Sequence, residues 1–134
     1  MLRQFLFPVA LLLLFPTLSQ AERLAPSPVE VSWVFDLHED ANSVPRGKVF
    51  LVVNGRKLLI LPKASAQYQA LNPTDYQAHN VPAAALTACT GWWAGQGADL
   101  YVLRRKNQLQ VFIRYLDEGA TKAAYKRLKV IPLR

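Results

Sequence analysis

The chain has 134 residues, with 16 basic side chains, 9 acidic side chains and one cysteine, Cys89. A single cysteine excludes an internal disulfide, so the fold must be held together by apolar burial. The length allows one domain with one core and is too short for two.

The first residues predict a cleavable export signal. An arginine precedes an apolar run over 5–15, and Ser19 and Ala21 occupy the two positions that a signal peptidase reads. The run is shorter than the roughly 20 residues needed to span a bilayer, and the cut site has no cysteine for a lipid anchor. We therefore expect removal of residues 1–21, one globular domain over 22–134 without a membrane span, and a periplasmic or secreted protein.

An alternating segment follows the predicted cut. Val29, Val31, Trp33 and Phe35 share one face of an extended chain, which is typical of a half-buried strand over 29–35. The next segment, 36–47, is polar and contains proline and glycine, so we expect a connecting loop there.

Two hairpins are predicted. Residues 48–53 and 56–61 flank Asn54-Gly55, a pair that tolerates the positive φ angles of a type I′ turn. These flanks are rich in Val, Leu and Ile, which is typical of strands covered on both faces. Lys106-Asn107 divides a second segment rich in β-forming residues, which predicts a hairpin over 99–116.

Short helices are expected around the hairpins. Residues 63–71 are interpreted as a helical turn, and Pro82 with the alanine-rich residues after it predicts a helix over 82–89. A basic helix over 120–127 followed by a strand over 128–133 is expected, with one strand over 125–131 as the alternative. The fold class is α+β or mostly-β, a single small domain built on antiparallel hairpins over 48–61 and 99–116, with one or two short helices.

The excess positive charge lies in the last quarter of the chain. Residues 104–134 hold nine bases and two acids, whereas residues 22–103 hold six bases and seven acids. This asymmetry predicts a basic face and an anionic partner, with an ordinary solvated face as the alternative. For an exported protein, that partner would be an anionic envelope component or an envelope protein, and not nucleic acid. The predicted basic contact residues are Arg104, Arg105, Lys106, Arg114, Lys126, Arg127 and Lys129.

The segment 91–97 places two tryptophans among three glycines. Neighbouring residues of a strand point to opposite faces, so we expect one of Trp92 and Trp93 to be exposed. An exposed indole would offer an aromatic platform to a sugar, a cation or a partner loop, and Gln96 is assigned to the same contact. The alternative is that both tryptophans fill an edge of the core.

Candidates for catalysis or metal binding are weak. Asp36, His38 and Asp40 would share one side of a strand, although a solvated acidic loop is the more typical interpretation. Cys89 could pair with either histidine, but it lies in an apolar run and is expected to be buried. No metal, cofactor or catalytic residue is predicted, and enzymatic activity is not expected.

These features together predict an exported, non-enzymatic envelope binding module. Its contact surface is expected to combine the Trp92-Trp93 loop with the basic segment 104–129. Three alternatives stay open: a small secreted inhibitor of a hydrolase, a subunit of an envelope complex, and a small hydrolase that uses Asp36, His38 or Cys89.

Overall fold

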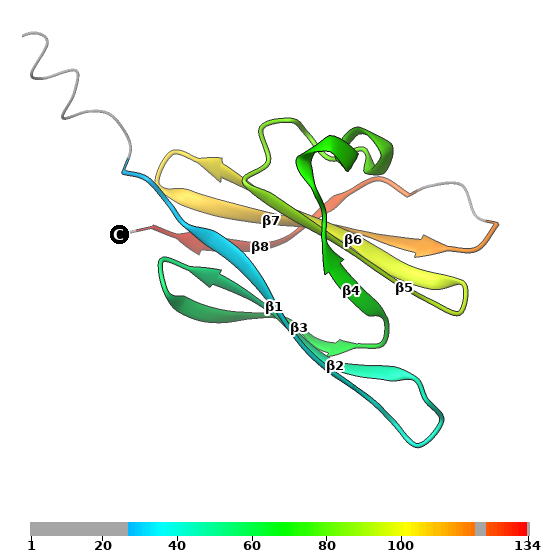
Figure 1. The fold of residues 1–134 in the computed structure, drawn as a ribbon. Helices are drawn as coiled ribbons and strands as arrows, with labels where there is room; N and C mark the ends of the chain where they lie inside the picture. Colours follow the sequence, from blue (N-terminus) through cyan, green and yellow to red (C-terminus); the bar gives the residue numbers. More distant parts are fainter. Residues whose placement is uncertain (1–26, 120–122, 134) are drawn as a thin grey trace, which may run out of the picture.

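The computed structural model describes residues 27–119 and 123–133, which form two antiparallel sheets (Figure 1). The first sheet has three strands in chain order: β1 (Val31–Glu39), β2 (Pro45–Val53) and β3 (Arg56–Ala64). The second has five, also in chain order: β4 (Gln67–Ala70), β5 (Thr87–Trp93), β6 (Gln96–Arg105), β7 (Gln108–Asp117) and β8 (Lys126–Pro132). Two short 3₁₀ helices lie between β4 and β5: η1 (Pro73–Asp75) and η2 (Gln77–His79). The protein is mostly β, as the sequence predicts.

Both predicted hairpins are present. β2 and β3 pair across Asn54 and Gly55, whose φ angles of 49° and 82° suit the expected turn. β6 and β7 pair in continuous register across Lys106-Asn107, with Arg105 opposite Gln108. Each hairpin extends a few residues beyond its predicted limits, because pairing with the neighbouring strands continues.

The main core lies between the two sheets. Alternate residues of β6 and β7 point inward and meet the inner face of β2 and β3, as the two-residue period of a strand requires. The predicted inner face of the first strand is confirmed, because Val29, Val31, Trp33 and Phe35 all pack against this core. The fully or nearly buried members are Leu51, Val53, Ile60, Cys89, Ala98, Leu100, Val102, Leu109, Val111, Ile113 and Ile131.

A second, smaller core lies on the outer face of the five-stranded sheet. The segment 71–86, which contains η1 and η2, covers part of that face (Figure 1). Its residues Tyr76 and Val81 pack with Ala88 and Tyr101 of the sheet. The segment between β4 and β5 is therefore a partial third layer, and it carries a histidine onto the sheet.

The predicted helices over 63–71 and 82–89 are wrong. Residues 63–71 end β3 and form β4, where the Tyr68 ring stacks on Phe35 with centroids 6.0 Å apart. The second segment turns near Pro82 and then enters β5, where Ala88 faces the outer core and Cys89 the inner one. A strand buried on both faces lacks alternation, so its apolar run resembles a helix in sequence.

The chain between β7 and β8 also differs from the prediction. Residues 123–125 form no helix and β8 spans Lys126–Pro132, so the predicted helix over 120–127 is wrong in its described part. The last strand agrees more closely with the alternative over 125–131 than with the prediction over 128–133. The predicted loop over 36–47 is mostly strand, because β1 continues to Glu39 and β2 starts at Pro45. The predicted export signal over 1–21 and residues 120–122 lie outside the described residues.

The outer face of the three-stranded sheet is less covered than its sequence indicates. Leu59 is 39% exposed there, and Phe50 is only half-buried beneath Lys57, whose Nζ lies 4.2 Å from the ring centroid. Across 27–119 and 123–133, no helix is long and apolar enough to cross a membrane.

Candidate binding surfaces

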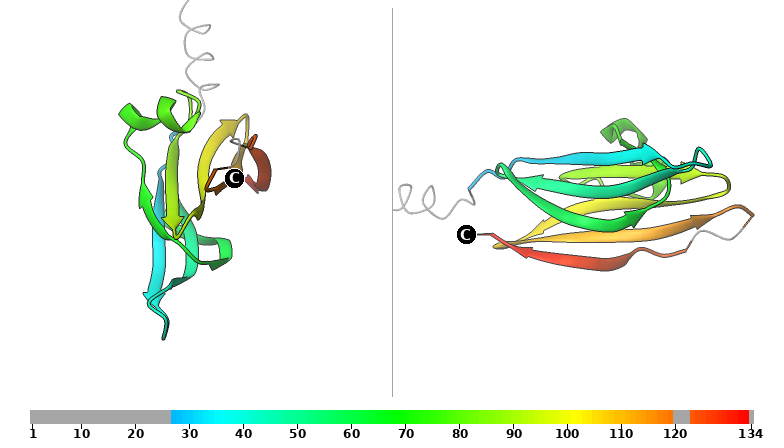
Figure 2. Two further views of the ribbon diagram at one scale, coloured as in Figure 1. Left: turned by 90° about the vertical axis from the view of Figure 1, so that its right-hand side faces the viewer. Right: turned by 90° about the horizontal axis from the view of Figure 1, so that it is seen from below.

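The predicted contact residues lie at opposite ends of the sandwich. The β5–β6 turn, with Trp92, Trp93 and Gln96, is at one end, and the β6–β7 turn, with Arg105 and Lys106, is at the other (Figure 2). The ten residues of β6 separate them by about 30 Å. The expectation that the Trp92-Trp93 loop and the basic segment form one surface is therefore wrong, because the extended strand β6 holds the two turns at its opposite ends.

The β2–β3 turn lies at the same end as the β6–β7 turn (Figures 1 and 2). The N-terminal segment links them: Glu30 N donates to Asn54 Oδ1 at 2.9 Å, and the Arg104 guanidinium donates to Ser27 O. The cations of both turns thus gather at one end, although the two turns are about 50 residues apart in the sequence. We call this set the basic end: Arg56, Lys57, Arg104, Arg105 and Lys106.

A shallow groove of about 150 Å³ lies at the basic end. It is bounded by Arg56 and the β2–β3 turn on one side and by Ile131 and Leu133 on the other. Leu133 N donates to Asn107 O at 2.7 Å, which fixes the end of the chain against the β6–β7 turn. The groove therefore has an apolar floor beside the cations.

The basic residues of β8 are spread along the edge of the five-stranded sheet. Lys126 Nζ lies 5.3 Å from the Tyr115 ring centroid, and Lys129 Nζ donates to Leu59 O at 3.2 Å. Arg127 pairs with Phe112 across the β7–β8 ladder and is exposed. Lysines at an edge strand discourage pairing with another chain, and Lys129 also joins β8 to β3.

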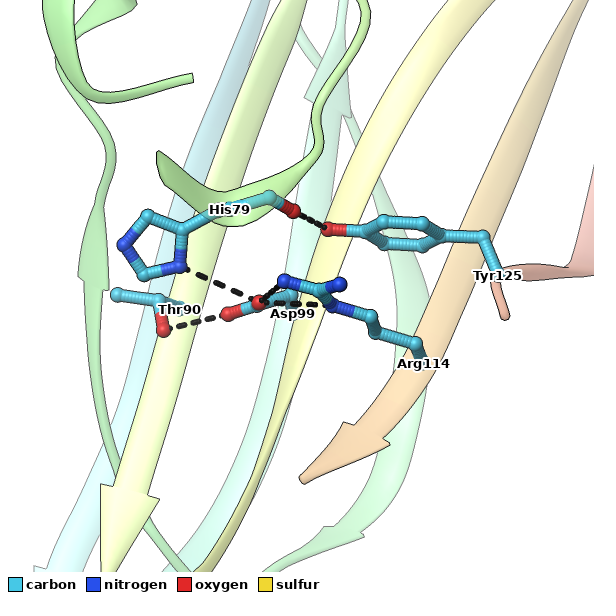
Figure 3. Close-up of polar contacts among 5 residues, drawn as sticks. All are labelled: His79, Thr90, Asp99, Arg114 and Tyr125. Atoms are coloured by element: carbon cyan, nitrogen blue, oxygen red, sulfur yellow. Dashed lines mark hydrogen bonds and ion pairs between the residues drawn. The ribbon is translucent and has the colours of Figure 1, made fainter. Parts of the chain in front are cut away.

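Arg114 is not part of any basic surface. Its side chain is 2% exposed, and it donates from Nε at 3.1 Å and from Nη2 at 3.0 Å to Oδ2 of Asp99, which is fully buried (Figure 3). The assignment of Arg114 to the contact surface is therefore wrong. The signal was available in the sequence, because the register of the hairpin around Lys106-Asn107 places Asp99 opposite Arg114.

Three further residues complete this polar cluster (Figure 3). Thr90 Oγ1 donates to Asp99 Oδ1 at 2.6 Å, and His79 Nδ1 lies 3.2 Å from Asp99 Oδ2. The Tyr125 hydroxyl donates to His79 O at 2.8 Å, and burial raises the pKa of that hydroxyl. The cluster therefore fastens η2 and the chain before β8 onto the sheet.

The tryptophans take opposite faces of β5, as expected. Trp92 is 47% exposed on the outer face, whereas Trp93 is half-buried. Gly91, next to Trp92, makes room for the Tyr68 ring, because a Cβ there would lie 2.4 Å from that ring. Gln96 is exposed opposite Trp93 in the ladder.

The residues considered for catalysis or metal binding are not brought together. Asp36 and His38 are exposed on β1, while Asp40 accepts Val44 N at 3.0 Å and Arg46 Nε at 2.6 Å in the β1–β2 turn. The hydrogen bond from Arg46 lowers the pKa of Asp40. Within the described residues, no three His, Cys, Asp or Glu side chains gather as metal ligands would.

Cys89 and His79 face away from each other. Cys89 is fully buried in the core between the sheets, and that burial raises the pKa of its thiol well above the usual range. His79 lies on the other side of the five-stranded sheet, against Asp99. A thiolate activated by His79 is thus incompatible with this arrangement, since the sheet stands between the two groups.

Comparison of the chain with protein-family models, with curated proteins and with solved structures found no match. The surfaces described above are therefore the basis for assigning a function.

Proposed function

We propose that the protein is an exported, non-enzymatic binding module that holds an anionic component of the cell envelope at its basic end. The observation that carries the proposal is the meeting of two cationic turns, β2–β3 and β6–β7, at one end of the sandwich. The export signal predicted over residues 1–21 supports the envelope as the setting.

The distribution of charge favours this end over the rest of the surface. Of its five cations, only Arg104 donates to backbone oxygens of the described chain, those of Ser27 and Lys106. The acids of the β1–β2 and β7–β8 turns lie at the far end, where Arg46 and Lys48 offset only part of their charge. At the basic end, the exposed carboxylate of Glu30 beside Asn54 offsets one of the five cations. An anion approaching the molecule is therefore drawn to the basic end.

The groove beside the cations narrows the chemistry of the partner. Its lining combines Arg56 with the apolar side chains of Leu58, Ile131 and Leu133. Such a floor suits a phosphate-bearing amphiphile, because the headgroup can meet the cations while an apolar part covers the groove. Anionic phospholipid and lipopolysaccharide share this chemistry.

The test is sedimentation of the mature chain with vesicles that contain phosphatidylglycerol, and separately with lipopolysaccharide. Each Lys or Arg near an anionic surface contributes about 1 kcal/mol, so removing two charges should weaken binding roughly 30-fold. Two variants apply: Arg105→Gln/Lys106→Asn, in which Asn tolerates the positive φ of position 106, and Arg56→Gln/Lys57→Gln. If the two variants lose binding to only one of the two probes, that probe identifies the source of the phosphate.

The matched control is Lys48→Gln/Lys63→Gln, which removes the same charge away from the basic end. This control should bind within about 3-fold of the parent protein, and binding by the parent should fall steeply as NaCl rises, because exposed charges are screened. Equal losses in all three variants would show a response to net charge alone and overturn the assignment to the basic end. Binding that survives both basic-end variants would refute the proposal.

A further inference from the structure

Trp92 lies where the outer face of the five-stranded sheet is left uncovered. The segment 71–86 packs over Ala88 and Tyr101 and reaches Asp99 through His79, but it stops short of Trp92. The indole is consequently 47% exposed, although burial is the usual fate of so large an apolar ring. Neither hydrophobic core includes Trp92, so the packing of the described residues gives no reason for a large ring at this position.

A shallow hollow of about 210 Å³ lies beside the indole. Gln67 stands opposite Trp92 in the β4–β5 ladder, and Gln69 stands opposite Thr90. Two residues apart on one strand, the two glutamines share a face and are separated by roughly 7 Å. The hollow is lined by Gln67, Tyr68, Gln69, Thr90 and Trp92.

The polar groups of the hollow are free to bind a ligand. Gln67 and Gln69 are exposed, and neither side-chain amide has a hydrogen-bond partner within the described part of the chain. Each amide offers a donor and an acceptor at one position. Thr90, in contrast, is held by Asp99 at 2.6 Å.

The lining of the hollow carries no charge. None of its five residues is ionised at neutral pH, since burial raises the pKa of Tyr68 to about 12. The carboxylate beneath Thr90, that of Asp99, is fully buried and paired with Arg114. Among the lining residues, a cationic ligand would meet no carboxylate and an anionic ligand would meet no cation.

We propose that Trp92, Gln67 and Gln69 form a subsite for a neutral pyranose unit of a glycan chain. The apolar C–H face of a pyranose ring covers an indole, while its hydroxyl groups both donate and accept hydrogen bonds. The hollow is shallow and is lined by residues of β4 and β5 alone, so it suits one ring of a longer glycan rather than an enclosed monosaccharide. This subsite stands apart from the basic end and does not depend on the proposed function.

The test is a titration of the mature chain with cellohexaose, chitohexaose and maltohexaose, followed by NMR at the indole Nε1–H and glutamine side-chain amide signals. At least one oligosaccharide should shift the signals of Trp92, Gln67 and Gln69 at millimolar concentration. Trp92→Ala should weaken binding by roughly 10-fold or more, and Trp92→Phe by less, because a smaller ring keeps part of the contact. Gln67→Ala/Gln69→Ala should weaken it about 5-fold to 10-fold.

The controls separate this subsite from general effects. Leu128→Ala removes another exposed apolar side chain, on β8, and should leave the titration unchanged. Arg105→Gln/Lys106→Asn should also leave it unchanged, so that failure of the basic end and failure of the subsite are distinguishable. The proposal would be overturned if none of the three oligosaccharides shifted these signals. It would also be overturned if the glutamine amide signals shifted equally in Trp92→Ala and in the parent protein.

Discussion

Asp99 and Arg114 are an ion pair in a place where charges are costly. Both side chains are removed from water, and their mutual attraction together with the bonds from Thr90 and His79 offsets the lost hydration. Arg114 also lies 4.9 Å from the Tyr125 ring centroid, so its guanidinium is packed as well as paired. Each charge depends on the other, since either one alone would be buried without compensation.

Arg114→Met should destabilise the protein by about 3–5 kcal/mol, because it leaves the Asp99 carboxylate buried without its cation. The double variant Asp99→Asn/Arg114→Met should lose less than the single variant, because no unpaired charge is left and the new amide oxygen still accepts from Thr90. Urea unfolding followed by circular dichroism measures both.

Asp117→Asn is the matched control for this pair, since it removes an exposed carboxylate from the same strand and should change the unfolding free energy by less than about 0.5 kcal/mol. A double variant that is as unstable as Arg114→Met, or more so, would contradict the interdependence of the charges.

At the scale of the strand, the β5–β6 hairpin depends on a close backbone approach. A Cβ on Gly97 would lie 1.8 Å from Gly91 O, which no side-chain adjustment can relieve because the obstacle is main chain. Gly97 stands opposite Trp92 in the ladder, so this approach sets the position of the exposed indole. Gly91 and Gly97, on either side along the chain, thus have a steric role.

Gly97→Ala should destabilise the protein by about 1–3 kcal/mol, because β5 and β6 must separate locally to admit the methyl group. It should also move the indole signal of Trp92. Thermal unfolding and NMR measure the two effects.

Gly55→Asn is the control for the Trp92 signal, because a Cβ there meets nothing within 4 Å and the turn lies at the other end of the sandwich. Its positive φ of 82° makes the substitution cost some stability, but the indole signal should not move. An alanine at position 97 that leaves both stability and the Trp92 signal unchanged would show that the approach is not as tight as described.

For the molecule as a whole, Cys89 reports on the opening of the sandwich. Its thiol is fully buried between the two sheets, and burial raises its pKa because the thiolate is disfavoured there. Only the thiolate reacts with a disulfide reagent, so the folded protein is protected both by exclusion and by its protonation state.

The thiol should therefore resist a disulfide reagent at pH 8 in buffer and react promptly in urea, where its pKa returns to the ordinary range. Raising the pH from 7 to 9 should increase the rate for the unfolded chain far more than for the folded one, since the folded pKa lies above this window. Absorbance of the thiol released from the reagent measures the rate. A rapid reaction in buffer would mean that the sheets open locally at β5.

The sequence predicted those parts of the fold that depend on local patterns. Alternation over 29–35 and the Asn54-Gly55 turn are local signals, and the structure confirms both. The predicted helix over 82–89 failed because Ala88 and Cys89 are buried on opposite faces. That burial depends on Tyr76 and Tyr101 on one side and on β2 on the other, which no local pattern in 82–89 reveals. Where two layers cover a strand, its period disappears from the sequence.

For the candidate surfaces, the sequence alone indicated some of the residues but neither the full sets nor their location. It indicated that one tryptophan is exposed and that the last quarter of the chain is basic. Only the tertiary structure decided that Arg114 is buried, that Arg56 and Lys57 join the β6–β7 turn, and that Trp92 lies at the other end. The physical reason is that a strand rises about 3.3 Å per residue and the chain reverses direction at each turn. Turns at the two ends of one strand therefore lie far apart, whereas turns that are distant in the sequence can lie at the same end of the sandwich.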